Sequence, residues 1–224
     1  MNKLIKSLIP LFIIISQVFA IAGFGLNLNQ SQFSVDAKTT LLGDFGSYGY
    51  DEFGGGIGVG GYLYIDAVPF VDLDLEFSAF GTNYDYLLTI GNVTKSYSVP
   101  YGSLAGYVTL QKKVFKLSIP LLAKAKLTVG AGLNSQTYKS IPDQSDLESL
   151  GVSSLTSDLP TLNKLVDYVN EKTVSKSGFH IQAGLQFKLL MLDSFLFYRQ
   201  VIVDDVIPGA KGFGSLNLRL GMGF

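Results

Sequence analysis

The chain of 224 residues contains no cysteine and no tryptophan, and it has a single histidine, His180. Without cysteine it can form no disulfide, no thiolate metal site and no lipidated N-terminal cysteine. Charged residues make up only 16% of the sequence, and the formal net charge is −1. This balance lacks the surplus of positive charge that is typical of nucleic-acid-binding proteins. We therefore expect no metal, no cofactor and no nucleic-acid partner.

Long apolar runs are also scarce, and the one near the start resembles the core of a secretory signal peptide. Two lysines precede an apolar stretch at 8–15, and the small residues Ala20 and Ala22 follow it. This layout predicts a signal peptide at 1–22 that is cleaved, and an uncleaved anchor is the alternative. The remaining residues, 23–224, suit a single domain. No later apolar run has the length of a spanning helix, so any membrane insertion must use strands.

What the sequence has in abundance is glycine and aromatic residues, with 25 Gly, 12 Tyr and 16 Phe. Most of the chain alternates between apolar and polar residues, which is the pattern of strands with two different faces. A phase slip in the first strand suggests a bulge near Gln30. The alternation predicts eight strands, at 23–36, 55–67, 70–83, 99–113, 122–138, 178–190, 194–203 and 212–224.

The connections between these strands differ in length. Short turns are expected around Val68–Pro69 and between Met191 and Asp193, whereas the connections 37–54, 84–98 and 139–177 are long. An even number of strands with short turns at one end predicts a closed antiparallel up-and-down transmembrane β-barrel. A soluble lipocalin-like barrel is the rival interpretation, and it would place the apolar face inside.

The distribution of charge favours the transmembrane interpretation. The apolar faces are continuous and suit lipid, whereas the polar faces carry opposite charges from different strands, which can neutralise each other in a narrow lumen. We expect one interlocked network that blocks the lumen. Its members are Asp72, Asp74, Glu76, Lys124, Lys126, Lys188 and Arg219.

The signal peptide, the eight alternating strands and the terminal Phe224 resemble the small outer-membrane β-barrels of diderm bacteria, in particular the OmpA/OmpX class. This resemblance implies a bacterial outer-membrane location, surrounded by lipid and lipopolysaccharide. The ending also resembles the signal that the barrel-assembly machinery reads, with Asn217 in its polar position and Met222 and Phe224 in its last two hydrophobic positions. Arg219 stands where that signal has glycine.

The connection 139–177 is predicted to contain a helix, because it has a helical apolar stripe behind the candidate caps Ser157 and Asp158. The helix could cap the barrel mouth, lean on the rim or take up hydrophobic molecules, and capping is the favoured alternative. The stripe consists of Leu159, Leu162, Leu165, Val166 and Val169.

Three functions remain open at this point. The favoured one is a non-enzymatic role in structure, adhesion or surface interaction through extracellular loops. The second is the binding or transport of hydrophobic small molecules through the 139–177 loop. The third is a lipid-modifying enzyme that uses His180, for which Ser175 and Ser177 lie close in sequence. The expected partners are an extracellular molecule or a hydrophobic ligand.

Overall fold

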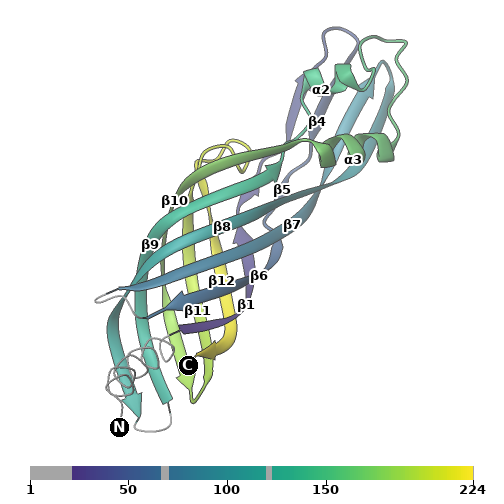
Figure 1. Cartoon of the computed structure of the whole chain (residues 1–224). Coiled ribbons are helices and arrows are strands. Elements are labelled where there is room, and N and C mark those ends of the chain that lie inside the picture. The colour runs from purple at the N-terminus through teal and green to yellow at the C-terminus, as the bar shows by residue number, and fades with distance from the viewer. Residues whose placement is uncertain (1–21, 67–70, 120–122, 224) are drawn as a thin grey trace, which may run out of the picture.

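A computed structural model describes residues 22–66, 71–119 and 123–223 (Figure 1). The predicted signal peptide, apart from Ala22, lies outside these residues, as do Phe224 and the turn predicted at Val68–Pro69. The described part forms a slanted barrel that continues at one end into a narrow projection.

Eight antiparallel strands form the barrel, and each pairs with its neighbours along the chain. The last strand closes the ring on the first, with register from Gly23–Gly223 to Gln32–Gly214. The predicted closed up-and-down barrel is therefore confirmed. The ring strands are β1 (Ala22–Gln32), β6 (Ile57–Ile65), β7 (Asp72–Ile90), β8 (Val93–Ile119), β9 (Ala123–Lys139), β10 (Thr173–Leu189), β11 (Leu192–Ile202) and β12 (Gly212–Gly223).

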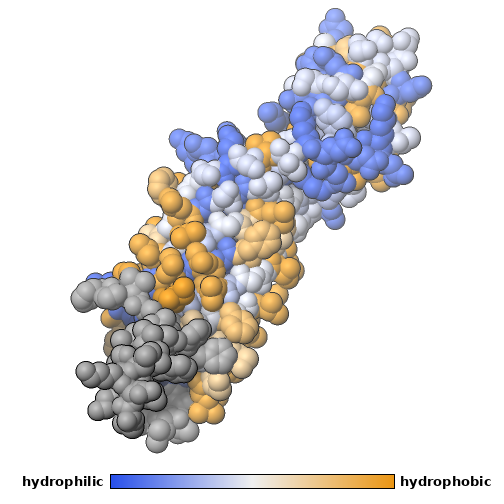
Figure 2. Space-filling model, viewed as in Figure 1, coloured by the Kyte–Doolittle hydropathy of each residue, from blue (hydrophilic) through white to orange (hydrophobic). Residues whose placement is uncertain are grey.

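Apolar side chains cover the outside of the barrel. Leu26 on β1 and Phe77 on β7 are 73% and 61% exposed, and similar residues lie on the other six ring strands. Figure 2 shows hydrophobic residues over much of the visible face of the barrel and mostly polar residues on the projection. In lipid, a closed barrel with this exterior satisfies all its backbone groups between strands. The chain thus has the architecture of an outer-membrane β-barrel, and the soluble alternative is wrong.

The projection, which we call the outer tower, is an extension of the barrel wall. β7 and β8 run on as a long hairpin to the turn at Gly91, whose φ of +57° lies in the left-handed region. β3 (Lys38–Leu41) and β4 (Gly46–Tyr50) extend this ribbon beyond β7. The predicted loops 37–54 and 84–98 are therefore largely strands, because their alternating side chains bury one face of the ribbon.

Two helices pack on the tower, α2 (Gln144–Ser149) and α3 (Leu162–Glu171). Both lie in the connection between β9 and β10, where a helix is predicted. Among the described residues, no helix is long and apolar enough to cross a membrane. A short pair of strands, β2 (Ser34–Val35) with β5 (Phe53–Gly54), connects the barrel rim to the tower.

The bulge predicted near Gln30 is wrong. The pairing of β1 with β12 runs without a shift through Gln32. The same alternate residues face the lumen throughout this segment. The apolar residues change face because the lumen is polar beside Asn29 and apolar beside Phe33 and Val35. The same change explains why the apolar face of β11 is ambiguous in the sequence, since Phe197 lies inside the barrel beside Arg199.

Candidate functional site: a filled lumen beneath an outer tower

The middle of the lumen is filled by charged side chains that cross it. Glu76 on β7 accepts hydrogen bonds from both terminal nitrogens of Arg199 on β11, each at 2.9 Å. Arg219 on β12 also donates to Glu76. All three side chains are at least 95% buried. Because the two arginines approach one carboxylate from other strands, they tie the walls of the lumen together.

The second carboxylate, Asp74, completes this central cluster. It accepts two hydrogen bonds from Arg219 and one from Gln111, the last at 2.9 Å. The guanidinium of Arg199 lies 3.8 Å from the ring centre of Tyr107, which adds a cation–π contact. Two acids thus neutralise two bases, and side chains occupy the space between them.

The predicted network is only partly brought together. Asp74, Glu76 and Arg219 lie in the central cluster, but Asp72 pairs with Lys113 at 3.0 Å nearer the short-turn end. The other predicted lysines lie near that end too. Lys126 is 3.9 Å from Asp66, Lys188 is 3.7 Å from Asp193, and Lys124 is exposed without an ion pair among the described residues.

The prediction of one interlocked network of seven residues is thus corrected. The register is the physical reason, because Lys124 is the second residue of β9 and stands opposite Lys188 at the short-turn end of the barrel. The strand β12 instead carries Arg219 to the depth of Asp74. Charges at the short-turn end pair locally or face solvent. Among them Asp193 is fully buried and accepts hydrogen bonds from Tyr64 and Gln186.

Sequence reasoning missed four charged members of these clusters, and one of them is Asp66 just after the end of β6. Arg199 lies on β11, whose inner face could not be assigned because Phe195 and Phe197 are inside. Asp193 was assigned to a turn, and Lys113 stands at a register shift between β8 and β9. The signal that could have identified Arg199 is its spacing, since Asp193, Phe195, Phe197 and Arg199 alternate.

His180 is fully buried in the lumen and not at a surface that lipid could reach. Its Nε2 atom lies 2.8 Å from Thr109 Oγ1, and its ring packs edge-on against Tyr107. Its Nδ1 atom has no hydrogen-bond partner among the described residues. Ser175 is instead bonded to Thr137 at 2.9 Å on the exposed side of the wall. The structure therefore does not bring His180 and Ser175 together.

The residues of the proposed assembly signal lie on both faces of β12. Asn217 points into the lumen, where it is 1% exposed and donates to Ser215 at 3.0 Å. Met222 faces outward and is 44% exposed. Phe224 lies outside the described residues.

Above the central cluster, the lumen is closed by apolar side chains. Phe33 makes edge contacts with Phe53 and Phe213, at ring distances of 6.3 and 6.4 Å. Tyr101 donates a hydrogen bond to the carbonyl of Val206 in the connection between β11 and β12. Three further side chains of that region are buried there, namely Val201, Val203 and Ile207.

The apolar stripe of the predicted helix packs against the tower and does not cap the barrel. Leu165 and Val169 are 0% and 2% exposed, and they belong to one core with Leu88 and Tyr97 of the β7–β8 hairpin. Leu159 and Val166 are half-buried and Leu162 is 43% exposed. The capping alternative is therefore corrected, because the hairpin reaches well beyond the barrel mouth and offers α3 an apolar surface.

Polar contacts fix the two helices in place. Tyr97 donates to the carbonyl of Pro160 at 2.8 Å, just before Thr161 caps α3. The buried Asp146 accepts hydrogen bonds from Tyr168 and Lys172, and its bond to the ammonium raises the pKa of Lys172. Hydrogen bonds from Ser145 and from the backbone of α2 lower the pKa of Asp143. The tower is thus a packed unit with its own core.

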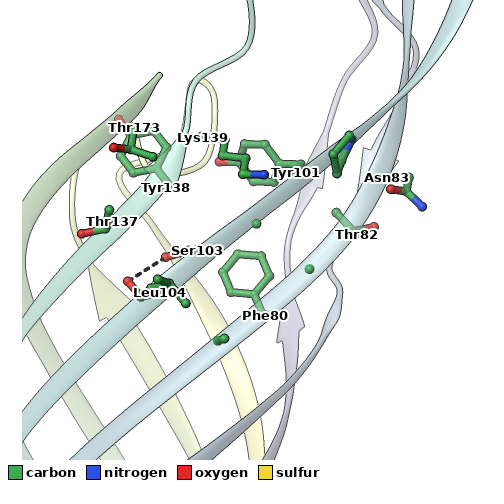
Figure 3. Close-up of a pocket in the computed structure, with 14 residues that line it drawn as sticks. Phe80, Thr82, Asn83, Tyr101, Ser103, Leu104, Thr137, Tyr138, Lys139 and Thr173 are labelled. Carbon is green, nitrogen blue, oxygen red and sulfur yellow. Dashed lines mark hydrogen bonds between the residues drawn. The ribbon is translucent and has the colours of Figure 1, made fainter. Parts of the chain in front are cut away.

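A groove of about 550 Å³ lies where the tower leaves the barrel, on the outside of the wall (Figure 3). The β7–β8 ribbon borders it on one side and the upper ends of β9 and β10 border it on the other. Its lining includes Phe80, Gly81, Leu104, Thr137 and Lys139. The chemistry of this groove changes from one end to the other.

No protein-family model matches the chain, and no curated protein matches it either. Several solved structures are similar in the arrangement of their strands. The N-terminal β-barrel domain of Pseudomonas aeruginosa OprF is 13% identical, with a TM-score of 0.44, over 90% of this chain and 99% of that chain. The outer membrane protein OprG from the same organism is 12% identical, with a TM-score of 0.44, over 91% and 94%.

A third similar structure is Ail, the attachment invasion locus protein of Yersinia pestis, in complex with the heparin analogue sucrose octasulfate. It is 13% identical, with a TM-score of 0.37, over 90% of this chain and 95% of that chain. The fold of this chain itself, a ring of eight antiparallel strands with an apolar exterior, is the OmpA/OmpX-like architecture that the sequence predicts.

Proposed function

We propose that this protein is a non-enzymatic outer-membrane barrel that holds the tower outside the cell, where the tower contacts an extracellular partner. The observation that carries the proposal is the packing of α3 on the β7–β8 hairpin. Leu165 and Val169 are almost fully buried in a core that lies beyond the barrel. A barrel that only sealed or stiffened the membrane would need no second core in this position.

The filled lumen supports the same proposal. Arg199, Arg219 and Glu76 cross the middle of the barrel, and the aromatic layer around Phe33 covers them. An interior of eight strands is just wide enough for side chains. The protein therefore offers its partner an outer surface and no wide aqueous path.

The tower surface near the helices is acidic. From Asp143 to Lys172 the chain has six carboxylates and two lysines, and one of those lysines is bound to the buried Asp146. Complementary charge accelerates encounter with a partner and favours partners of opposite sign. The expected partner therefore presents a positively charged surface.

The proposal is tested with two matched variants of the tower. Leu165→Asp places a carboxylate in the tower core, whereas Leu155→Asp places the same group on a side chain that is 61% exposed. Cells that display each variant are measured for attachment to surfaces coated with polylysine, with heparin or with neither. Heat-modifiable gel mobility confirms that each barrel is folded in the membrane.

We expect Leu165→Asp to reduce attachment to polylysine and Leu155→Asp to leave it intact. The proposal fails if both variants attach to every surface as the parent protein does. Sensitivity of the Leu165→Asp cells to detergent, without any change in attachment, would assign a structural role in the envelope instead.

A further inference from the structure

The groove at the base of the tower lies on the outer face of the wall, where lipid and water meet. Alternate residues of β7 and β8 face outward here, from Ala79 to Asn83 and from Pro100 to Leu104. Leu104 is 50% exposed and lies beside the apolar exterior of the barrel. The opposite end of the groove is formed by Lys139 and Thr173, close to the tower (Figure 3).

The groove is hollow because two glycines meet in the wall and because a strand pair ends there. Gly81 and Gly102 are register partners, so neither β7 nor β8 places a side chain over this point. A Cβ atom added at Gly81 would approach only the carbonyl of Tyr101, at 3.9 Å. The pairing of β8 with β9 ends at Ser103–Tyr138, so the two strands separate above it.

A second depression, of about 900 Å³, follows on the same face one step nearer the middle of the barrel. Gly106 and Ser135 line it, each two residues from Leu104 and Thr137 of the first groove. A Cβ atom added at Gly106 would meet no atom within 4 Å. Apolar side chains surround this space, among them Leu63, Phe77, Val108 and Leu133. Its depth in the apolar band suits hydrocarbon chains.

The upper end of the first groove has the opposite chemistry. Thr173 and Asn83 supply a hydroxyl and an amide group, and Lys139 supplies a positive charge. The ammonium of Lys139 bonds to the neutral amide of Asn170, and it makes no ion pair among the described residues. Its charge is therefore free to attract an anion. The two depressions together are cationic above and apolar below.

We infer that these depressions form a binding site for one lipid of the outer leaflet whose phosphate groups give its headgroup a net negative charge. Its acyl chains would lie over Gly81 and Gly106, and its phosphate would contact Lys139 and Thr173. A lipid matches both ends of the site, whereas a water-soluble anion would leave the apolar part uncovered. This inference rests on the proposed orientation, with the tower outside.

The test uses native mass spectrometry of the full chain, purified in detergent and mixed with defined lipids. The probes are bisphosphorylated lipid A, the same lipid without its phosphates, and phosphatidylcholine. Gly81→Leu and Gly106→Leu fill the two depressions from positions where an added side chain has room. Leu218→Phe is the matched control, because it enlarges an outward side chain on β12, on the opposite wall. Lys139→Gln removes only the charge.

We expect the parent chain and Leu218→Phe to retain one molecule of bisphosphorylated lipid A. Gly81→Leu and Gly106→Leu should lose most of it while keeping heat-modifiable mobility. Lys139→Gln should bind this lipid about fivefold more weakly, in line with the contribution of one lysine at an anionic membrane. It should bind the lipid without phosphates as the parent does.

Equal retention by the parent and by both glycine variants would overturn the inference, as would equal loss in Leu218→Phe. A preference for phosphatidylcholine would also contradict it. None of these outcomes involves attachment to polylysine, which depends on the tower surface. Failure of the lipid site is therefore distinguishable from failure of the proposed function.

Discussion

Arg199 and Glu76 join opposite walls of the barrel through two parallel hydrogen bonds of 2.9 Å. They belong to β11 and β7, which are four strands apart in either direction around the ring of eight. A bidentate pair fixes both the distance and the orientation of its partners. This pair, with Arg219 on the same carboxylate, holds the lumen closed at mid-depth.

The central cluster should contribute strongly to stability. Glu76→Gln would leave Arg199 and Arg219 buried with only Asp74 to balance them, and breaking a buried ion pair costs about 3–5 kcal/mol. Urea unfolding from lipid vesicles measures the loss. Lys124→Gln is the control, because Lys124 is exposed and has no ion pair among the described residues. Similar midpoints for the two variants would contradict the importance of the cluster.

The same cluster should prevent ion flow. We expect the refolded parent chain to give no large, stable current in planar bilayers, because side chains fill the interior of an eight-stranded barrel. The apolar layer around Phe33 and Phe213 adds a second barrier. A steady porin-like conductance would show that the lumen is open.

The tower should lose its packing without loss of the barrel. Leu165→Ala truncates a side chain that is 0% exposed, and comparable substitutions cost about 2–5 kcal/mol. We expect a protease added outside the cell to cleave the connection between β9 and β10 faster, while heat-modifiable mobility is unchanged. Leu162→Ala, at a side chain that is 43% exposed, should have a much smaller effect. Equal cleavage of the two variants would contradict the assigned tower core.

Acid should weaken the start of α2. Hydrogen bonds from Ser145 and from the backbone of Asp146 hold the pKa of Asp143 below its ordinary value of 3.8. The stability that Asp143 contributes is therefore complete above that value and is lost as the pH falls through its lowered pKa.

Hydrogen exchange of residues 143–150, measured between pH 5 and pH 2 (an interval of about three pH units around the ordinary carboxyl pKa), tests this expectation. Protection should fall toward the acid end in the parent chain. Asp143→Asn keeps an acceptor for the backbone N–H of Asp146 but cannot titrate, so its protection should change less. An identical decrease in the two proteins would contradict the role of Asp143.

Much of the barrel could be predicted from alternation, because lipid requires an apolar side chain at every second position. The prediction was less successful where that rule does not apply. Phe33 and Val35 lie in an apolar part of the lumen, so their phase suggested a bulge that does not exist. The 84–98 segment leaves the membrane as a hairpin, and one of its faces is buried by helices that sequence alone could not place.

The charged residues of the lumen could also be predicted only in part. The sequence identified Asp74, Glu76 and Arg219, because each lies on the polar face of a regularly alternating strand. It could not show that Arg199 joins them or that Lys124 stays apart, since both depend on register between strands. The register of each strand depends on its pairing with both neighbours around the ring, so it cannot be predicted from the sequence of one strand.

The central claim is that the tower lies outside the cell and that the short turns face the periplasm. The chain has no cysteine, so single cysteines report position without background. Asn92→Cys marks the turn at the tip of the tower, and Met191→Cys marks the exposed turn between β10 and β11. We expect a membrane-impermeant maleimide to label Asn92→Cys in intact cells and Met191→Cys only after the outer membrane is opened. Labelling of Met191→Cys but not Asn92→Cys in intact cells would contradict the account.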